Sequence, residues 1–150
     1  MIRLALYETE IAQNLGAMLR VCACFGVPVD VIEPLGFLWD DKRMRRAGMD
    51  YIDIANVTCH KSFSAFLEQK KGRIVLLDTK ADQGFWDIRY ELTDIIMVGK
   101  ESCGVPNNVY DICDVKVSIP MVSGVRSLNV TTAAAIGLTE AIRQTAQLQF

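Results

Sequence analysis

Short apolar runs alternate along the chain with longer segments of helical periodicity. Six of these runs are predicted strands, and most of them are nearly continuous in apolar residues, which is typical of strands covered on both faces of a sheet. The predicted strands are Ile2–Tyr7, Val29–Ile32, Ile52–Val57, Ile74–Leu77, Asp94–Val98 and Val115–Ile119. Most of them are followed by enough residues for a helix, so the chain has the pattern of repeated strand–helix units.

The clearest helical pattern begins at residue 11. Its apolar side chains recur every three or four residues and form one stripe: Ile11, Leu15, Met18, Cys22 and Phe25. Gly26 and Pro28 end this helix. Further helices are predicted at residues 41–47, 62–70, 106–111 and 128–147. The alternation predicts an α/β fold, a mostly parallel sheet with helices on both faces, in one domain that spans residues 1–150.

Composition and charge narrow the class of protein. The chain has 150 residues, of which 51% are apolar, and its 16 basic and 18 acidic side chains give a formal net charge of −2. These values exclude intrinsic disorder, collagen and a histone-like polycation. They also argue against a protein that coats nucleic acid through bulk charge, but they leave room for a local basic patch.

The sequence also predicts a compartment. Glu8 and Glu10 interrupt the N-terminal apolar run before it reaches the length of a signal peptide, and no run approaches the roughly 20 apolar residues of a membrane-spanning helix. The five cysteines are an odd number without C-x-x-C spacing, which disfavours a disulfide framework or a zinc site. We therefore expect a cytoplasmic protein without a metal.

Three segments that follow predicted strands are rich in glycine, proline and small polar residues. They are residues 78–80, 99–106 and 120–129, and the carboxyl ends of parallel strands are where ligands bind in such sheets. A phosphate-binding loop has a lysine and a hydroxyl residue directly after its second glycine, whereas here Val105 and Pro106 follow Gly104. No G-x-G-x-x-G occurs either. His60 is the only histidine, and we expect a solvated loop residue rather than a catalytic base.

Several polar residues are candidates for chemistry. Gly16 and Arg20 are four residues apart on one face of the first helix, so a ligand has room beside the guanidinium. The alternative is that Arg20 simply extends into solvent, as arginines on helix surfaces do. Asn14 lies near the start of that helix, where it is a candidate cap or first-turn residue. In the last helix Ser127 is a plausible N-cap, and Asn129 needs a polar partner if it is buried.

A run of cations lies between the second and third predicted strands: Lys42, Arg43, Arg45 and Arg46. One interpretation is a solvated helix face that the neighbouring aspartates balance. The other is a patch that contacts nucleic-acid phosphates, which can supply affinity even on an acidic protein.

Taken in order, three motifs resemble the SPOUT superfamily of S-adenosylmethionine-dependent RNA methyltransferases, in its 2′-O-methylating branch. They are N-x-G-x-x-x-R at residues 14–20, G-x-E-x-x-G-x-P at residues 99–106, and I-P-M followed by S-L-N-V within residues 119–130. Residues 33–51 are similar to the bacterial members of this family that methylate the wobble nucleotide of tRNA anticodons. The similarity spans essentially the whole chain.

The resemblance implies a deep C-terminal trefoil knot and an obligate homodimer, neither of which follows from the periodicity. It implies that S-adenosylmethionine contacts Leu77, Gly99, Ile119 and Ser127. Asn14, Arg20 and Glu101 would lie near the target ribose, and Arg126 and Asn129 would hold RNA or the reacting centre. The partner subunit would complete the site.

The function that this resemblance implies is methylation of the 2′-hydroxyl of the wobble pyrimidine in leucine tRNAs. The alternatives are a methyltransferase of the same fold with another tRNA or rRNA target, and a catalytically silent RNA-binding dimer. The sequence departs from the family pattern in one loop, where Lys100 and Cys103 replace the expected proline and arginine. The positive charge is thus three residues away from its expected position.

Overall fold

The computed structural model describes residues 1–40, 51 and 55–146. Its centre is a six-stranded sheet in the order β3-β2-β1-β5-β4-β6, in which every neighbouring pair is parallel. The strands are β1 (Arg3–Tyr7), β2 (Val29–Ile32), β3 (Val57–His60), β4 (Ile74–Leu77), β5 (Ile95–Val98) and β6 (Val115–Val117). The predicted parallel α/β sheet is confirmed.

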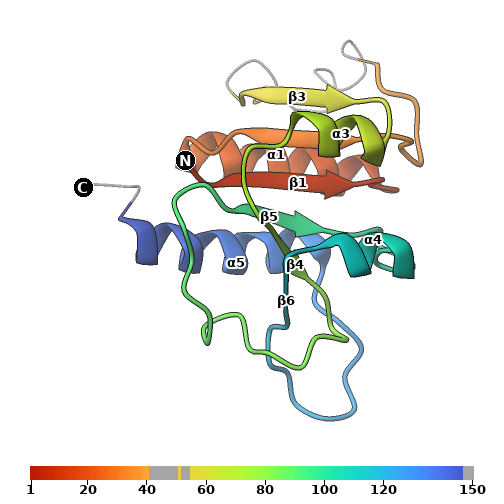
Figure 1. The fold of residues 1–150 in the computed structure, drawn as a ribbon. Helices are drawn as coiled ribbons and strands as arrows, with labels where there is room; N and C mark the ends of the chain where they lie inside the picture. Colours follow the sequence, from red (N-terminus) through yellow and green to blue (C-terminus); the bar gives the residue numbers. More distant parts are fainter. Residues whose placement is uncertain (41–50, 52–54, 147–150) are drawn as a thin grey trace.

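Helices cover both faces of this sheet, as predicted (Figure 1). They are α1 (Ala12–Phe25), α3 (Phe63–Gln69), α4 (Asn107–Ile112) and α5 (Val130–Thr145). Helices α1 and α5 pack against one face and α3 and α4 against the other. The predicted helix at residues 41–47, and with it Lys42, Arg43, Arg45 and Arg46, lies outside the described residues.

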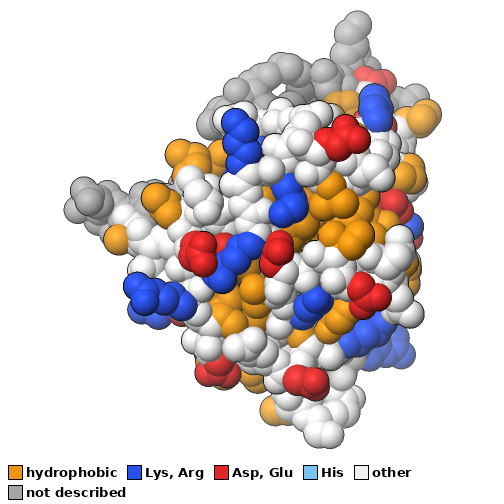
Figure 2. Space-filling view, viewed as in Figure 1, with side chains coloured by type: hydrophobic (Ala, Val, Ile, Leu, Met, Phe, Trp, Pro, Cys, Tyr) orange, Lys and Arg blue, Asp and Glu red, His pale blue; other side chains and the backbone are white. Residues whose placement is uncertain are grey.

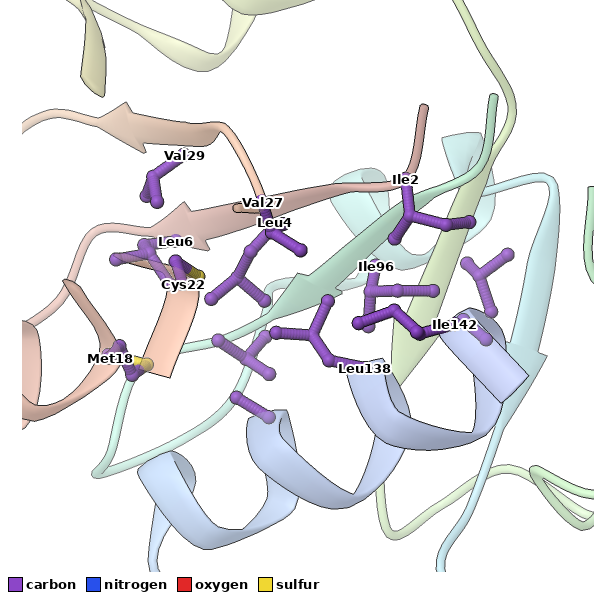
Figure 3. Close-up of a cluster of buried hydrophobic side chains, with 14 of the residues drawn as sticks. Ile2, Leu4, Leu6, Met18, Cys22, Val27, Val29, Ile96, Leu138 and Ile142 are labelled. Atoms are coloured by element: carbon purple, nitrogen blue, oxygen red, sulfur yellow. The ribbon is translucent and has the colours of Figure 1, made fainter. Parts of the chain in front are cut away.

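The larger core lies between the sheet and the pair α1 and α5. Met18 and Cys22 of α1 and Leu138 and Ile142 of α5 are directed toward the strands (Figure 3). A Cβ atom at Gly137 of α5 would come within 2.6 Å of the Leu77 side chain at the end of β4. The small residue at position 137 therefore lets α5 approach the sheet closely at the end of β4. Leu77, which ends this strand, is one of the predicted cofactor contacts.

The third predicted strand overlaps the observed one only at its last residue. We expected it at residues 52–57, of which 52–54 lie outside the described residues, and β3 runs from Val57 to His60. Ala55 is instead buried in the core cluster ahead of the strand. Because β3 is an edge strand with partly exposed residues, its sequence lacks the continuous apolar run of the central strands.

His60 is not the solvated loop residue that the sequence suggested. It is the last residue of β3 and is 3% exposed. Its Nε2 lies 2.9 Å from a carboxylate oxygen of Asp30 in β2, and Arg3 of β1 donates to both oxygens of the same carboxylate. Because three adjacent strands each contribute one member, these residues form a polar bridge across the sheet, which periodicity does not reveal.

No helix in the described part of the chain is long and apolar enough to cross a membrane. All five cysteines lie among the described residues and none forms a disulfide, and the described residues contain no group of three or more potential metal ligands.

Burial predicts which of these thiols react. Desolvation in the core raises the pKa of Cys22 to about 12 and that of Cys113 to about 11. At pH 8 both thiols remain protonated and covered, whereas Cys24, Cys59 and Cys103 are exposed. We expect a thiol reagent to label the three exposed cysteines of the native protein and all five after denaturation, as measured by peptide mass spectrometry. Labelling of Cys22 in the native protein would contradict the packing of α1.

Candidate functional site

A cleft of about 560 Å³ opens at the edge of the sheet where strands β4, β5 and β6 end. Its walls come from the loops that follow these strands and from the starts of α1 and α5. The lining consists of Leu77–Lys80, Val98–Gly104, Ile119, Met121 and Ser127–Val130, with Ile11, Asn14 and Ala133. The connections after β4 and β6 also run side by side, since Gly84 forms a parallel bridge with Ser118 (Figure 1).

Most of the predicted site residues meet at this cleft. All four residues assigned to the cofactor line it: Leu77, Gly99, Ile119 and Ser127. Asn14, Glu101 and Asn129 line it as well. Arg20 and Arg126 are exposed and are not among its lining residues. The sequence therefore predicted the cleft from three separate segments, although it gave no information about the contacts between them.

The loop between β5 and α4 closes on itself at the cleft. Lys100 and Gly104 exchange two backbone hydrogen bonds of 2.9 Å each. A Cβ atom at Gly99 would lie 2.5 Å from the carbonyl carbon of Gly104, so a larger residue at this position forces the loop apart. Gly104 itself has φ +69°, a conformation that favours glycine. Both glycines are thus required for a narrow loop that brings backbone to the cleft.

Glu101 caps helix α1 from a distant part of the chain. The N-cap residue of this helix is Ile11, and its side chain makes no capping hydrogen bond. Instead the Glu101 carboxylate accepts hydrogen bonds from the backbone N–H groups of Glu10 (2.8 Å) and Ile11 (3.3 Å). A carboxylate at a helix N-terminus is favoured by the free N–H groups and the helix dipole.

Asn14 connects the starts of α1 and α5. Its Nδ2 donates to Glu101 (3.0 Å), and its Oδ1 accepts a bond of 3.1 Å from Asn129. The backbone carbonyl of Asn14 also accepts a 3.4 Å bond from the hydroxyl of Thr131. Asn14 is therefore a first-turn residue of α1 and not its cap, and its side chain bridges three separate segments of the cleft wall.

The N-cap of α5 is Asn129 and not Ser127. The Asn129 Oδ1 accepts hydrogen bonds from the backbone N–H groups of Thr131 (2.8 Å) and Thr132 (3.4 Å). Because α5 begins two residues later than predicted, Ser127 stays in the preceding loop. Asn129 is exposed and not buried, and its side chain bonds to Asn14 and to the helix start.

Sequence reasoning missed two acidic residues behind the cleft, Glu8 and Glu10. The Glu10 carboxylate accepts bonds of 2.9 Å from both the backbone N–H and the hydroxyl of Ser102, and these bonds lower its pKa. Lys100 forms an ion pair with Glu8 at 2.5 Å, which raises the pKa of the lysine. In this chain the charge of Lys100 is thus paired within the protein. In the sequence the two glutamates only marked the end of an apolar run.

Arg20 lies further along α1, with its guanidinium carbon 5.2 Å from the centre of the Tyr51 ring. At this distance the guanidinium makes a cation–π interaction with the ring, which favours one orientation of the exposed Arg20 side chain.

Comparisons with known proteins show which family and fold this chain shares. The model of the SpoU rRNA Methylase family matches residues 1–139. A curated relative from Beijerinckia indica, a tRNA (cytidine(34)-2′-O)-methyltransferase, is 48% identical over 148 residues, which cover 97% of this chain and 92% of the relative.

Solved structures match over almost the same length. A structure that concerns the 2-OH methylation of C/U34 on tRNA superimposes with a TM-score of 0.89 at 36% identity, covering 96% of this chain and 95% of the other. The SpoU methyltransferase AviRb from Streptomyces viridochromogenes, solved with AdoMet, has a TM-score of 0.79 at 23% identity and covers 96% of this chain and 60% of the other, a likeness of fold.

The fold is that of a SPOUT-type methyltransferase. The chain belongs to the SpoU rRNA Methylase family, and the family expected from the sequence motifs is confirmed. The trefoil knot stays a prediction that follows from this membership.

The corrected cap gives a matched pair of variants. Asn129→Ala removes the N-cap of α5 and the bond to Asn14, and we expect it to lower the free energy of unfolding by about 1–2 kcal/mol. Ser127→Ala removes a loop hydroxyl that caps nothing, so its effect should stay within about 0.5 kcal/mol. Urea denaturation followed by circular dichroism measures both. Equal losses for the two variants would contradict the assigned cap.

Proposed function

We propose that this chain transfers the methyl group of S-adenosylmethionine to a ribose 2′-hydroxyl of leucine tRNAs. The target is the pyrimidine at position 34, which is the wobble position. We propose further that the protein acts in the cytoplasm as a homodimer. The observation that carries the proposal is the 48% identity, over 97% of the chain, to a tRNA (cytidine(34)-2′-O)-methyltransferase. The cleft supports it by bringing Asn14, Glu101 and Asn129 together with the four residues expected to contact the cofactor.

The residues of the cleft fit S-adenosylmethionine. A volume of about 560 Å³ lies within the usual range of small-molecule sites. The side chains of Leu77, Ile119 and Leu128 offer apolar contact for a flat base, while the narrow loop at Gly99 brings backbone polar groups close. We assign Leu77, Gly99, Ile119 and Ser127 to this molecule.

When bound, S-adenosylmethionine supplies an activated methyl group on a sulfonium. The task of the protein is then to align the ribose hydroxyl with it, and alignment alone can contribute up to about 7–11 kcal/mol of the barrier. We propose that Asn14, Glu101 and Asn129, which are joined by hydrogen bonds, hold the starts of α1 and α5 in place around the reacting hydroxyl.

Arg20 has a different role in the proposal. A guanidinium stays charged in proteins, so it is unsuited to remove a proton. A fixed positive charge instead orients the adjacent phosphate and stabilises negative charge that develops on the ribose oxygen. Arg20 lies outside the cleft lining of its own chain, so we propose that the homodimer brings it to the cleft of the partner subunit.

The RNA contact is assigned to Lys42, Arg43, Arg45, Arg46 and Arg126. On the face shown in Figure 2, cationic and acidic side chains of the described residues are interspersed, and such a surface gives little net attraction for phosphates. A concentrated run of four cations supplies that attraction, and dimerisation doubles it.

The direct test is methyl transfer from labelled S-adenosylmethionine into total tRNA, followed by nucleoside mapping. We expect label in 2′-O-methylcytidine or 2′-O-methyluridine at position 34 of leucine tRNAs. Label at another tRNA position would change the assigned substrate but keep the chemistry. Cofactor binding without any incorporation would favour a silent RNA-binding dimer.

The role of Arg20 is tested by Arg20→Lys. Lysine keeps the charge but loses the planar fork of donors and the stacking on Tyr51. We expect kcat to fall by about 100-fold, the scale of one lost transition-state contact, while the affinity for S-adenosylmethionine stays unchanged. Single-turnover kinetics and calorimetry measure the two quantities. Near-normal turnover in this variant would contradict the assignment.

A further inference from the structure

The segment between β1 and α1 contacts the loop between β5 and α4 at three consecutive residues. Lys100 pairs with Glu8, the Glu101 carboxylate accepts from the backbone of Glu10, and Ser102 donates to the Glu10 carboxylate. Strands β1 and β5 are neighbours in the sheet, with Leu6 paired to Val98, so both segments leave the same edge side by side. The loop is one wall of the cleft, whereas Glu8 and Glu10 are not among the residues that line it.

The contacts of Glu10 and Glu101 are reciprocal. Each carboxylate accepts a backbone N–H of the other segment, at 2.8 Å for Glu10 to Glu101 and 2.9 Å for Ser102 to Glu10. The two segments are therefore fixed in one register, because a shift of either one breaks both bonds. Charge-assisted bonds of this kind are stronger than bonds between neutral groups.

The Glu10 backbone is itself held from the other side. Gly36 donates its backbone N–H to Thr9 (2.9 Å), and a Cβ atom at Gly36 would lie 2.6 Å from the Glu10 Cα. Glu10 is thus packed against a neighbouring loop and presents its carboxylate to Ser102. The two bonds that Lys100 and Gly104 exchange fix the base of the loop, while its tip at Ser102 and Cys103 is exposed.

From this arrangement we infer that Glu10 is a positioning residue for the cofactor: it holds the tip of the 99–104 loop in the conformation that closes one wall of the cleft. The inference rests on the proposed function, because it takes S-adenosylmethionine as the molecule in the cleft. The Lys100–Glu8 ion pair lies at the base of the same loop. It gives Lys100, which replaces the proline of the family pattern, a structural role in this chain.

The test uses the full-length protein and titration calorimetry with S-adenosylmethionine. Glu10→Ala removes both bonds to Ser102, and we expect the Kd to rise about fivefold, the scale of a solvated charge-assisted contact. Glu10→Gln keeps an oxygen for the backbone N–H and an amide that the hydroxyl can accept from, so its Kd should stay within about twofold. Glu91→Ala, which removes a carboxylate paired with Arg73 ahead of β5, is the matched control and should leave the Kd unchanged.

Kinetics separate positioning from a general loss of structure. For Glu10→Ala we expect a raised KM for S-adenosylmethionine, an unchanged KM for tRNA, and normal kcat at saturating cofactor. A fall in kcat that saturating cofactor does not restore would overturn the inference.

The outcomes also separate this inference from the proposed function. If the unaltered protein binds S-adenosylmethionine and Glu10→Ala binds it equally well, the positioning role is wrong and the proposed function stands. If Glu91→Ala weakens binding as much as Glu10→Ala does, the role is also wrong. If the unaltered protein does not bind the cofactor at all, the proposed function falls and the inference falls with it.

Discussion

Parallel pairing of β1, β5, β4 and β6 is the constraint on which the rest of the structure depends. It brings the carboxyl ends of these strands to one edge of the sheet, so that loops far apart in sequence become neighbours. Burial on both faces by α1 with α5 and by α3 with α4 fixes that pairing. The cleft is the space left between the loops, and it exists only because four strands end together.

Helix starts supply much of the polar structure at this edge. The first N–H groups of a helix have no partner within it, and here α1 and α5 begin side by side at the cleft. Asn129 accepts hydrogen bonds from backbone N–H groups at the start of α5, in its own chain segment. Glu101, from the loop after β5, accepts hydrogen bonds from the backbone N–H groups of the two residues that precede α1. Asn14 joins the two caps. The motifs of the family are therefore connected physically, since one residue of each participates in the same hydrogen-bonded chain.

The accuracy of the sequence-based predictions followed burial. Central strands such as β4 and β5 are covered on both faces, so their apolar runs located them closely. The edge strand β3 and His60 were placed wrongly, because an edge strand is only partly covered and His60 is buried through a bond to Asp30 on the neighbouring strand. Ser127 and Asn129 were both acceptable caps by residue type, and only the actual start of α5 distinguishes them.

The sequence by itself determined the parallel α/β class, the two-sided burial and the membership of the family, because these depend on periodicity and on the order of short motifs. It also selected the loops that form the cleft, since glycine and proline after a strand mark them. The tertiary structure alone decided that Glu8 and Glu10 hold the 99–104 loop, that Glu101 caps a helix some 90 residues away, and that Arg20 lies outside the cleft of its own chain. These are contacts between distant segments, and a linear pattern records residue types but not which of them meet.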